Sequence, residues 1–231
     1  MNPLKILYEN DTMLVVDKPA GVSVLKEGQE KESTIADFLT QQFPVLQKVP
    51  RSGIVHRLDK DTSGILLVAK SEKLLHELQK LFLERKVQKT YICLVSGVVT
   101  EPEGRIDAPL ARSPQNKIKQ KAYSPTEPKG ERAREAITAY RTLERFKDYT
   151  LLEIKPKTGR KHQIRTHLAF LNHPVAGDKL YGFKNQLTPE GLQRQFLHAS
   201  AISFEMPRGK TKEFNSELPE DLKTVLEKLR K

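Results

Sequence analysis

Residues 56–70, with the sequence HRLDKDTSGILLVAK, are the part of this chain best suited to chemistry. Two carboxylates, Asp59 and Asp61, lie in a turn that contains Ser and Gly, and the apolar run 65–69 follows. A strand that begins directly after such a turn gives functional side chains a rigid support. The residues alone therefore predict a carboxylate beside Arg57, held at the end of a strand.

A carboxylate in this position can act as a base or as a nucleophile. Aspartate has a reference pKa near 3.9, so Asp59 is ionised at neutral pH and needs no activating partner. A paired arrangement is also possible, in which a glycosidase or nucleotide hydrolase uses Asp59 together with Asp17, Asp61 or Asp107. None of these pairs has a diagnostic spacing.

The same segment resembles the RluA-type pseudouridine synthases. Their signature, His-Arg-Leu-Asp followed by two variable residues and Thr-Ser-Gly, is complete at 56–64. Two further landmarks follow in the family's order: Lys89-Thr90-Tyr91, and TGRKHQIRTH at 158–167 with His173-Pro174 and Gly177-Asp178 behind it. The likeness runs from about residue 14 to residue 204, which is nearly the whole chain.

The resemblance implies a role for each matched residue. Asp59 becomes the catalytic aspartate and Arg165 its ion-pair partner. Tyr91 becomes the active-site tyrosine, whose ring stacks on the target uracil and whose hydroxyl serves proton transfer. Arg57 would enter the RNA near the flipped nucleotide, and Leu197 would line the uracil pocket. The implied activity is isomerisation of uridine in structured RNA, with large-subunit rRNA as the first expectation and tRNA as the alternative. Because isomerisation oxidises nothing, neither a cofactor nor a metal is expected.

The charge of the chain agrees with an RNA partner. Forty Lys and Arg against 29 Asp and Glu give a net charge of +11, which favours a polyanion. One basic cluster comprises Lys155, Lys157, Arg160, Lys161 and Arg165. From it we expect Arg160 and Lys161 to bind RNA. The second cluster, Lys117, Lys119 and Lys121, occupies alternate positions, so an extended strand would place all three on one face.

The histidines and the cysteine argue against a metal site. His162 and His167 would lie about 140° apart on a helix, which aims them poorly at one ion. We expect His162 to contact a phosphate or to pack at the helix end. Asp178 reads as a turn residue and His56 as a structural residue that orients the Asp59 loop. Cys93 is the only cysteine, which excludes an internal disulfide.

The hydrophobic pattern predicts an α+β fold, with a mixed, largely antiparallel sheet and peripheral helices in a single catalytic domain, residues 1–231. Strands are expected at 14–18, 65–69, 137–143, 149–154 and 196–204. Thr34 and Ser71 should cap helices, the second with Arg85 and Lys86 in its last turn. A short helix should begin near His162 or Gln163, and an amphipathic helix should end the chain. Residues 101–135 read as a basic loop or irregular hairpin inserted in the domain.

The N-terminus has no signal-peptide pattern, and no apolar run reaches membrane-spanning length. We therefore expect a cytoplasmic monomer with RNA as its partner and no membrane contact. The chain begins almost at once with the core, so we expect the form of the family that lacks the N-terminal ribosomal-protein-like RNA-binding domain. A catalytically idle RNA-binding protein on the same scaffold is the competing hypothesis, which the intact Asp59, Tyr91 and Arg165 disfavour.

Overall fold

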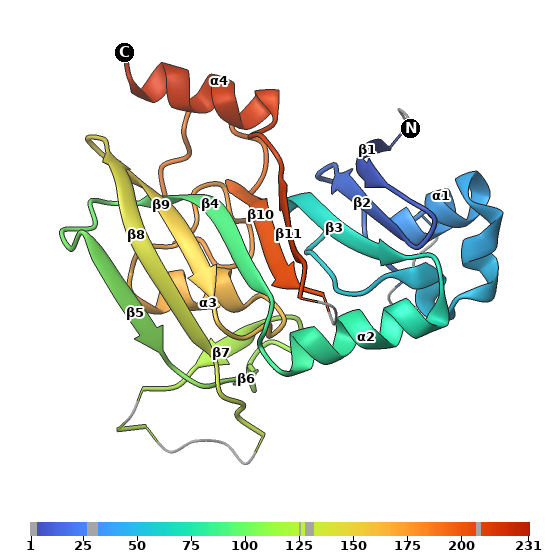
Figure 1. Ribbon diagram of the computed structural model, residues 1–231. Coiled ribbons are helices and arrows are strands. Elements are labelled where there is room, and N and C mark those ends of the chain that lie inside the picture. The colour runs from blue at the N-terminus through green and yellow to red at the C-terminus, as the bar shows by residue number, and fades with distance from the viewer. Residues whose placement is uncertain (1–3, 27–31, 125, 128–131, 207–208) are drawn as a thin grey trace. The chain divides into compact units, whose positions relative to one another are not determined.

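The computed structural model describes residues 4–26, 32–124, 126–127, 132–206 and 209–231 (Figure 1). The chain divides into two compact units, which are described separately below. Unit 1 comprises Met1–Gln88 and Ala199–Glu217, and unit 2 comprises Lys89–His198 and Leu218–Lys231. The single catalytic domain expected from the sequence stays a prediction, because one domain can contain two compact units.

Unit 1 is built on an antiparallel sheet. Its strands run in the order β1-β2-β3-β10, and β11 pairs with β10. Their bounds are Lys5–Glu9 for β1, Met13–Lys18 for β2, Ser63–Ala69 for β3, Leu197–Glu205 for β10 and Thr211–Asn215 for β11, and the first two residues of β10 belong to unit 2. Every side chain of β3 is buried, so both faces of this strand are covered. The strand that follows the Asp59 turn is therefore a central and rigid one.

The helices of unit 1 begin where their capping residues predict. Helix α1, Ile35–Gln42, has a complete capping box: the Thr34 side chain accepts from the Asp37 N–H, and the Asp37 carboxylate accepts from the Thr34 N–H. Two short 3-10 helices, Pro44–Lys48 and Pro50–Gly53, follow it.

Helix α2, Glu72–Leu83, begins after the cap Ser71. The prediction that Arg85 and Lys86 lie in its last turn is wrong. The helix ends at Leu83, and Arg85 adopts a left-handed conformation with φ of 60°, which no α-helix continues.

Unit 2 contains four antiparallel strands, in the order β4-β9-β8-β5. The strands are Gln88–Ser96, Glu103–Asp107, Ile137–Arg145 and Tyr149–Pro156 for β4, β5, β8 and β9, and Gln88 itself belongs to unit 1. Neighbouring residues of β4 pack in different hydrophobic cores. Cys93 packs in the core that contains Ile164 of helix α3, Gln163–Phe170, and Leu94 packs in the core that contains Leu222 of helix α4, Glu220–Leu229. Side chains alternate across a strand, so α3 and α4 cover opposite faces of this sheet.

A small hairpin projects from unit 2. Its strands β6, Leu110–Arg112, and β7, Gln120–Ala122, pair antiparallel in a sheet of their own. The prediction that Lys117, Lys119 and Lys121 share one face of a strand is wrong, because only Lys121 lies in β7 and the other two lie in the turn before it. Residues 125 and 128–131 of the expected insertion are outside the described residues.

These pairings confirm the expected α+β class with a largely antiparallel sheet. Across the described ranges, none of the helices combines the length and apolar character that crossing a membrane requires.

Candidate active site

The loop that carries Asp59 connects the second 3-10 helix to β3 in unit 1. Asp59 is half-buried and Asp61 is exposed. The Asp59 carbonyl accepts a hydrogen bond of 3.1 Å from the Thr62 N–H, which closes the turn. Thr62 is itself buried, so the chain enters β3 directly behind the carboxylate.

A buried lysine holds this loop. Lys18, the last residue of β2, is 0% exposed, and its ammonium donates to the carbonyls of Pro19, Val22 and Lys60, each at 2.8 Å. The Lys60 carbonyl also accepts from the Gly21 N–H at 3.0 Å. A buried charge is stable only when such partners replace water. Lys18 therefore fixes the peptide unit between Lys60 and Asp61, one residue beyond Asp59.

Sequence reasoning assigned no role to Lys18. The available signal is a lysine at the end of the apolar strand 13–16, followed by a proline that stops the strand.

Two further contacts support the same loop. His56 accepts from the Leu67 N–H through Nε2 at 3.1 Å and stacks on Phe82 with ring centroids 4.9 Å apart, which agrees with the structural role predicted for it. Gly64 has φ of +114°, and a Cβ there would lie 2.2 Å from the Ala199 carbonyl oxygen. Only glycine fits at that position. Arg57, by contrast, is exposed.

In unit 2, Arg165 of α3 forms a two-pronged ion pair with Asp178. Its Nε and Nη2 donate to the two carboxylate oxygens at 2.6 and 2.8 Å, and the side chains are 8% and 0% exposed. Burial alone would raise the pKa of Asp178, but the hydrogen bonds and charge of Arg165 together with two backbone N–H groups hold that pKa below its ordinary value. Those N–H groups belong to Leu180 and Tyr181 and donate at 2.9 and 3.0 Å.

Asp178 is therefore the turn residue that the sequence predicts, and in addition the partner of Arg165, which the sequence did not reveal. The ion pair predicted between Arg165 and Asp59 joins residues of different units and stays a prediction.

The turn before α3 is fixed by the buried side chain of Gln163. Its Oε1 accepts from the Thr158 hydroxyl at 2.7 Å and from the Arg160 N–H at 2.9 Å, while its Nε2 donates to the Ile137 carbonyl at 3.0 Å. The Arg160 guanidinium donates to the Glu135 carbonyl at 3.0 Å, and Lys161 is exposed. Gln163 thus holds the two basic residues predicted to bind RNA at the start of the helix.

The two histidines of this region have different surroundings. His167 is buried between the Thr138 hydroxyl, 2.8 Å from Nδ1, and the Ala108 carbonyl, 2.9 Å from Nε2, and burial lowers its pKa. Both of its ring nitrogens are engaged by protein groups. His162 is half-buried at the helix N-terminus, and its Nδ1 lies 3.0 Å from the Tyr181 hydroxyl. The expected packing at the helix end is therefore present, and its phosphate contact stays a prediction.

Tyr91 and Leu197 contact the same core of unit 2. Tyr91 is half-buried in β4 and packs against the cluster that includes Cys93 and Leu197. Lys89 lies two residues earlier, on the same face of the strand. Its ammonium donates to the Thr158 carbonyl at 3.2 Å, and burial lowers its pKa to about 8. A lysine at this point of the site was not predicted.

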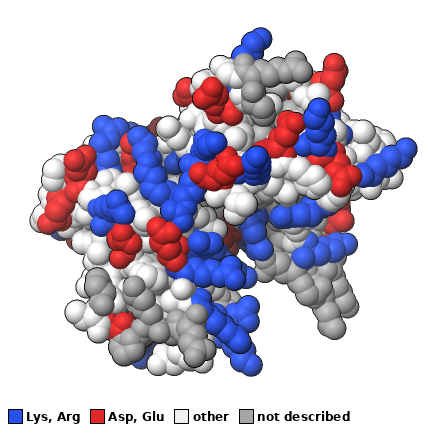
Figure 2. Space-filling view, turned by 60° about the horizontal axis from the view of Figure 1, so that its bottom comes forward, with Lys and Arg blue, Asp and Glu red and all other residues white. Residues whose placement is uncertain are grey.

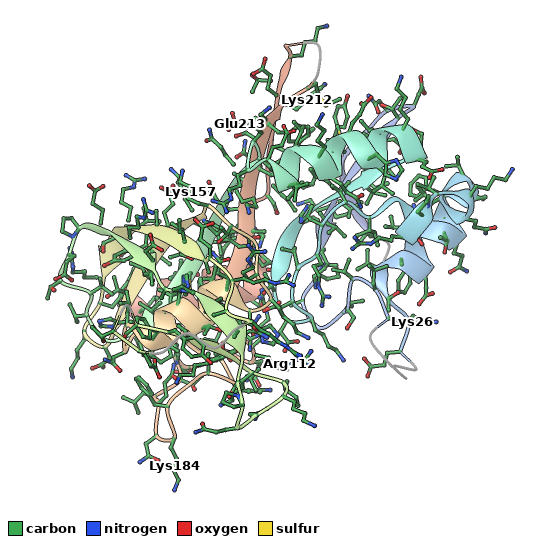
Figure 3. The ribbon with its side chains drawn as sticks, turned by 90° about the horizontal axis from the view of Figure 1, so that it is seen from below. Lys26, Arg112, Lys157, Lys184, Lys212 and Glu213 are labelled. Atoms are coloured by element: carbon green, nitrogen blue, oxygen red, sulfur yellow. The ribbon has the colours of Figure 1, made fainter. Side chains whose placement is uncertain are left out.

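Basic side chains cover much of the face shown in Figure 2. The exposed basic residues of unit 2 include Arg112, Lys117, Lys155, Lys157 and Lys161; Figure 3 labels Arg112 and Lys157. Some lysines of unit 2 pair with acidic residues: Lys121 pairs with Glu127 and lies over the Tyr123 ring at 4.8 Å, and the Lys155 ammonium lies 3.0 Å from the Glu153 carboxylate. Surface positive charge of this kind binds phosphate groups.

The fold and these side chains define an RNA-modifying isomerase, a pseudouridine synthase. The family model described as RNA pseudouridylate synthase matches residues 12–170, and the chain belongs to that family. It is 35% identical to ribosomal large subunit pseudouridine synthase D of Haemophilus ducreyi, over 99% of this chain and 71% of that protein. It is 38% identical to the uncharacterized RNA pseudouridine synthase YlyB of Bacillus subtilis, over 99% of this chain and 73% of that protein. The solved structure of human RNA pseudouridylate synthase domain containing 4 superposes with a TM-score of 0.78 at 26% identity, over 98% of this chain and 93% of that one.

Replacing Lys18 by methionine tests the support of the Asp59 loop. The variant keeps a long apolar stem but removes the charged donor from three backbone carbonyls. We expect the free energy of unfolding to fall by about 3 kcal/mol, measured by urea titration followed by circular dichroism, since the chain has no tryptophan. Lys26→Met is the control (Figure 3), because Lys26 is exposed and lies 3.6 Å from Asp37. Equal effects of the two changes would refute the role of Lys18.

Replacing Asp178 by asparagine tests the support of Arg165. A neutral partner leaves a buried guanidinium without its counter-charge, which costs roughly 3–5 kcal/mol of unfolding free energy. Misplacement of Arg165 should also lower turnover on the order of 100-fold. Asp221→Asn is the matched control, because Asp221 forms the same fork with Arg194 but is 53% exposed.

The same pair has a pH signature. Because folding lowers the pKa of Asp178 below 3.8, its stabilising contribution is complete above that value and is lost as the pH falls through the folded pKa. The difference in unfolding free energy between the wild type and Asp178→Asn should therefore shrink below pH 3.8. A difference that grows on acidification would contradict the ion-pair assignment.

Proposed function

We propose that this pseudouridine synthase acts on uridines of large-subunit rRNA and that Asp59 is its catalytic carboxylate. The observation that carries the second part is the Asp59 loop itself, which a fully buried lysine and a closed turn fix in place. A rigid loop of this kind suits a catalytic carboxylate, because a displacement of about 1 Å can lower a reaction rate about 100-fold.

The reaction conserves atoms and electrons. The bond between ribose C1′ and uracil N1 breaks, the base turns, and C1′ bonds to C5; the proton of C5 is lost and N1 gains one. Asp59 can attack the sugar, attack the ring or remove the proton, and each role needs an ionised carboxylate at the nucleoside. Because no electrons are exchanged, we propose that no cofactor takes part.

Arg165 is proposed as the positive partner of Asp59. A guanidinium has about five N–H donors in a fixed fork, so a second carboxylate can share it with Asp178. In this arrangement Asp178 orients the guanidinium, and Arg165 orients Asp59. Lysine cannot replace this geometry, because its ammonium has no planar fork.

Tyr91 and Leu197 are proposed to contact the uracil, and the Tyr91 hydroxyl to take part in proton transfer. The exposed residues Arg57 and Lys161 are proposed to contact RNA, together with Arg160 and His162. The support is chemical. An aromatic ring stacks on a base, and a flipped nucleotide leaves a gap in the helix that an inserted guanidinium can fill. That the chain works as a cytoplasmic monomer stays a prediction.

The proposal for rRNA rests on the names of the similar proteins, among them synthase D of Haemophilus ducreyi and of Xanthomonas campestris. Pseudouridines should be mapped in total RNA from a strain with and without this gene. We expect specific uridines of large-subunit rRNA to lose their modification in the strain that lacks the gene. Loss confined to tRNA would assign the alternative substrate.

Asp59→Asn tests the chemistry with a nearly isosteric change. We expect turnover to fall roughly 10²–10⁴-fold, because an amide can neither attack nor accept the proton, while RNA affinity is retained. Turnover is measured as tritium released from RNA that contains 5-tritiated uridine. Asp61→Asn, an exposed carboxylate of the same turn, is the control and should keep its activity. If both variants remained active, Asp59 would lose its assigned role.

A further inference from the structure

Tyr181 connects the hairpin β6–β7 to the residues around Arg165. Its ring lies 5.1 Å from the Arg165 guanidinium carbon, and its backbone N–H donates to Asp178. Its hydroxyl accepts a hydrogen bond of 2.7 Å from the N–H of Gln120, the first residue of β7. One side chain thus contacts the buried ion pair with its ring and the hairpin with its hydroxyl.

The remaining hydrogen-bonding capacity of this hydroxyl is directed at helix α3. The oxygen accepts from Gln120, so its own proton can be donated to Nδ1 of His162, 3.0 Å away. The two rings meet edge to face, at 83° with centroids 5.7 Å apart. Burial raises the pKa of Tyr181, so the hydroxyl remains protonated around neutral pH. His162 itself has a left-handed backbone, with φ of 54°, a conformation uncommon outside glycine and held by its surroundings.

The hairpin that Tyr181 holds is basic and has an ordered tip. The Asn116 side chain accepts from the Ile118 N–H at 3.0 Å, and the Asn116 carbonyl accepts from the Lys119 N–H at 3.0 Å. The Lys119 ammonium lies 5.9 Å from the Tyr181 ring, and Arg112 and Lys117 are exposed. The cations of this hairpin are therefore presented on a preformed turn.

We propose that Tyr181 is a positioning residue for RNA: its hydroxyl fixes the hairpin on the N-terminus of α3, so that Arg112, Lys117 and Lys119 meet phosphate groups in register with Arg165. This inference rests on the proposed function and adds to it the element that sets where the RNA lies. The ring alone suffices to pack on Arg165. The hydroxyl is needed to hold the hairpin, because it accepts the hydrogen bond from the Gln120 N–H.

Tyr181→Phe separates these two roles. The variant keeps the ring on Arg165 but removes the acceptor of the Gln120 N–H. Loss of one such hydrogen bond changes an equilibrium by roughly five- to tenfold, so we expect hydrogen exchange of the Gln120 amide to accelerate by about that factor. We expect KM for RNA to rise by a similar factor, while kcat changes little. Tyr149→Phe is the control, because Tyr149 is buried in the other core of the same unit.

A double-mutant cycle then tests whether the hydroxyl acts through the basic hairpin. Lys117→Gln combined with Lys119→Gln should raise KM in the wild-type background and raise it distinctly less in the Tyr181→Phe background, because the hairpin is no longer held in register. Additive effects, unchanged Gln120 exchange, or a loss of kcat and thermal stability with KM unchanged would each overturn the proposal. Failure of the proposed function would look different: the wild-type protein would form no pseudouridine, while Gln120 exchange would still report whether Tyr181 holds the hairpin.

Discussion

Transferring the charges of Arg165 and Asp178 out of water costs several kcal/mol for each ion, and the fold offsets this cost with hydrogen bonds. Two run between the ions, and two more come from the backbone of the turn that follows Asp178. The pair therefore fixes that turn as well as the guanidinium. Tyr181, at the end of the turn, holds the hairpin in its place. The order of unit 2 around α3 thus depends on one buried ion pair.

Unit 1 also contains a buried charge, and its hydrogen-bond acceptors are backbone carbonyls. Lys18 is as buried as Asp178, but its hydrogen bonds go to three backbone carbonyls of two loops. These carbonyl dipoles stabilise the buried ammonium. Anchoring by carbonyls therefore keeps the Asp59 loop rigid.

The features that the sequence predicts are those fixed by neighbouring residues. The Thr34 cap bonds to a residue three positions away, and side chains on one face of a strand or helix recur every two to four residues. Strands, helices and the Asp59 turn can therefore be predicted from short stretches of sequence. The missed features join distant segments: Arg165 and Asp178 are 13 residues apart, Lys18 and Lys60 are 42, and Gln120 and Tyr181 are 61. Such contacts produce no periodic pattern in the sequence. The sequence also does not distinguish a lysine that is buried in the fold from one that is exposed.

The basic residues that give the net charge of +11 also differ in burial, which the sequence does not reveal. In the basic cluster 155–165 the sequence presents five similar cations, but the structure buries Arg165 and exposes Lys155, Lys157 and Lys161. At physiological ionic strength the Debye length is about 8 Å. Salt therefore weakens the electrostatic attraction between exposed cations and RNA, and barely affects the attraction within a buried ion pair. RNA attraction and the geometry of the site therefore rest on separate groups of charges. The proposed contacts with RNA therefore depend on salt concentration, whereas the Arg165–Asp178 pair barely does.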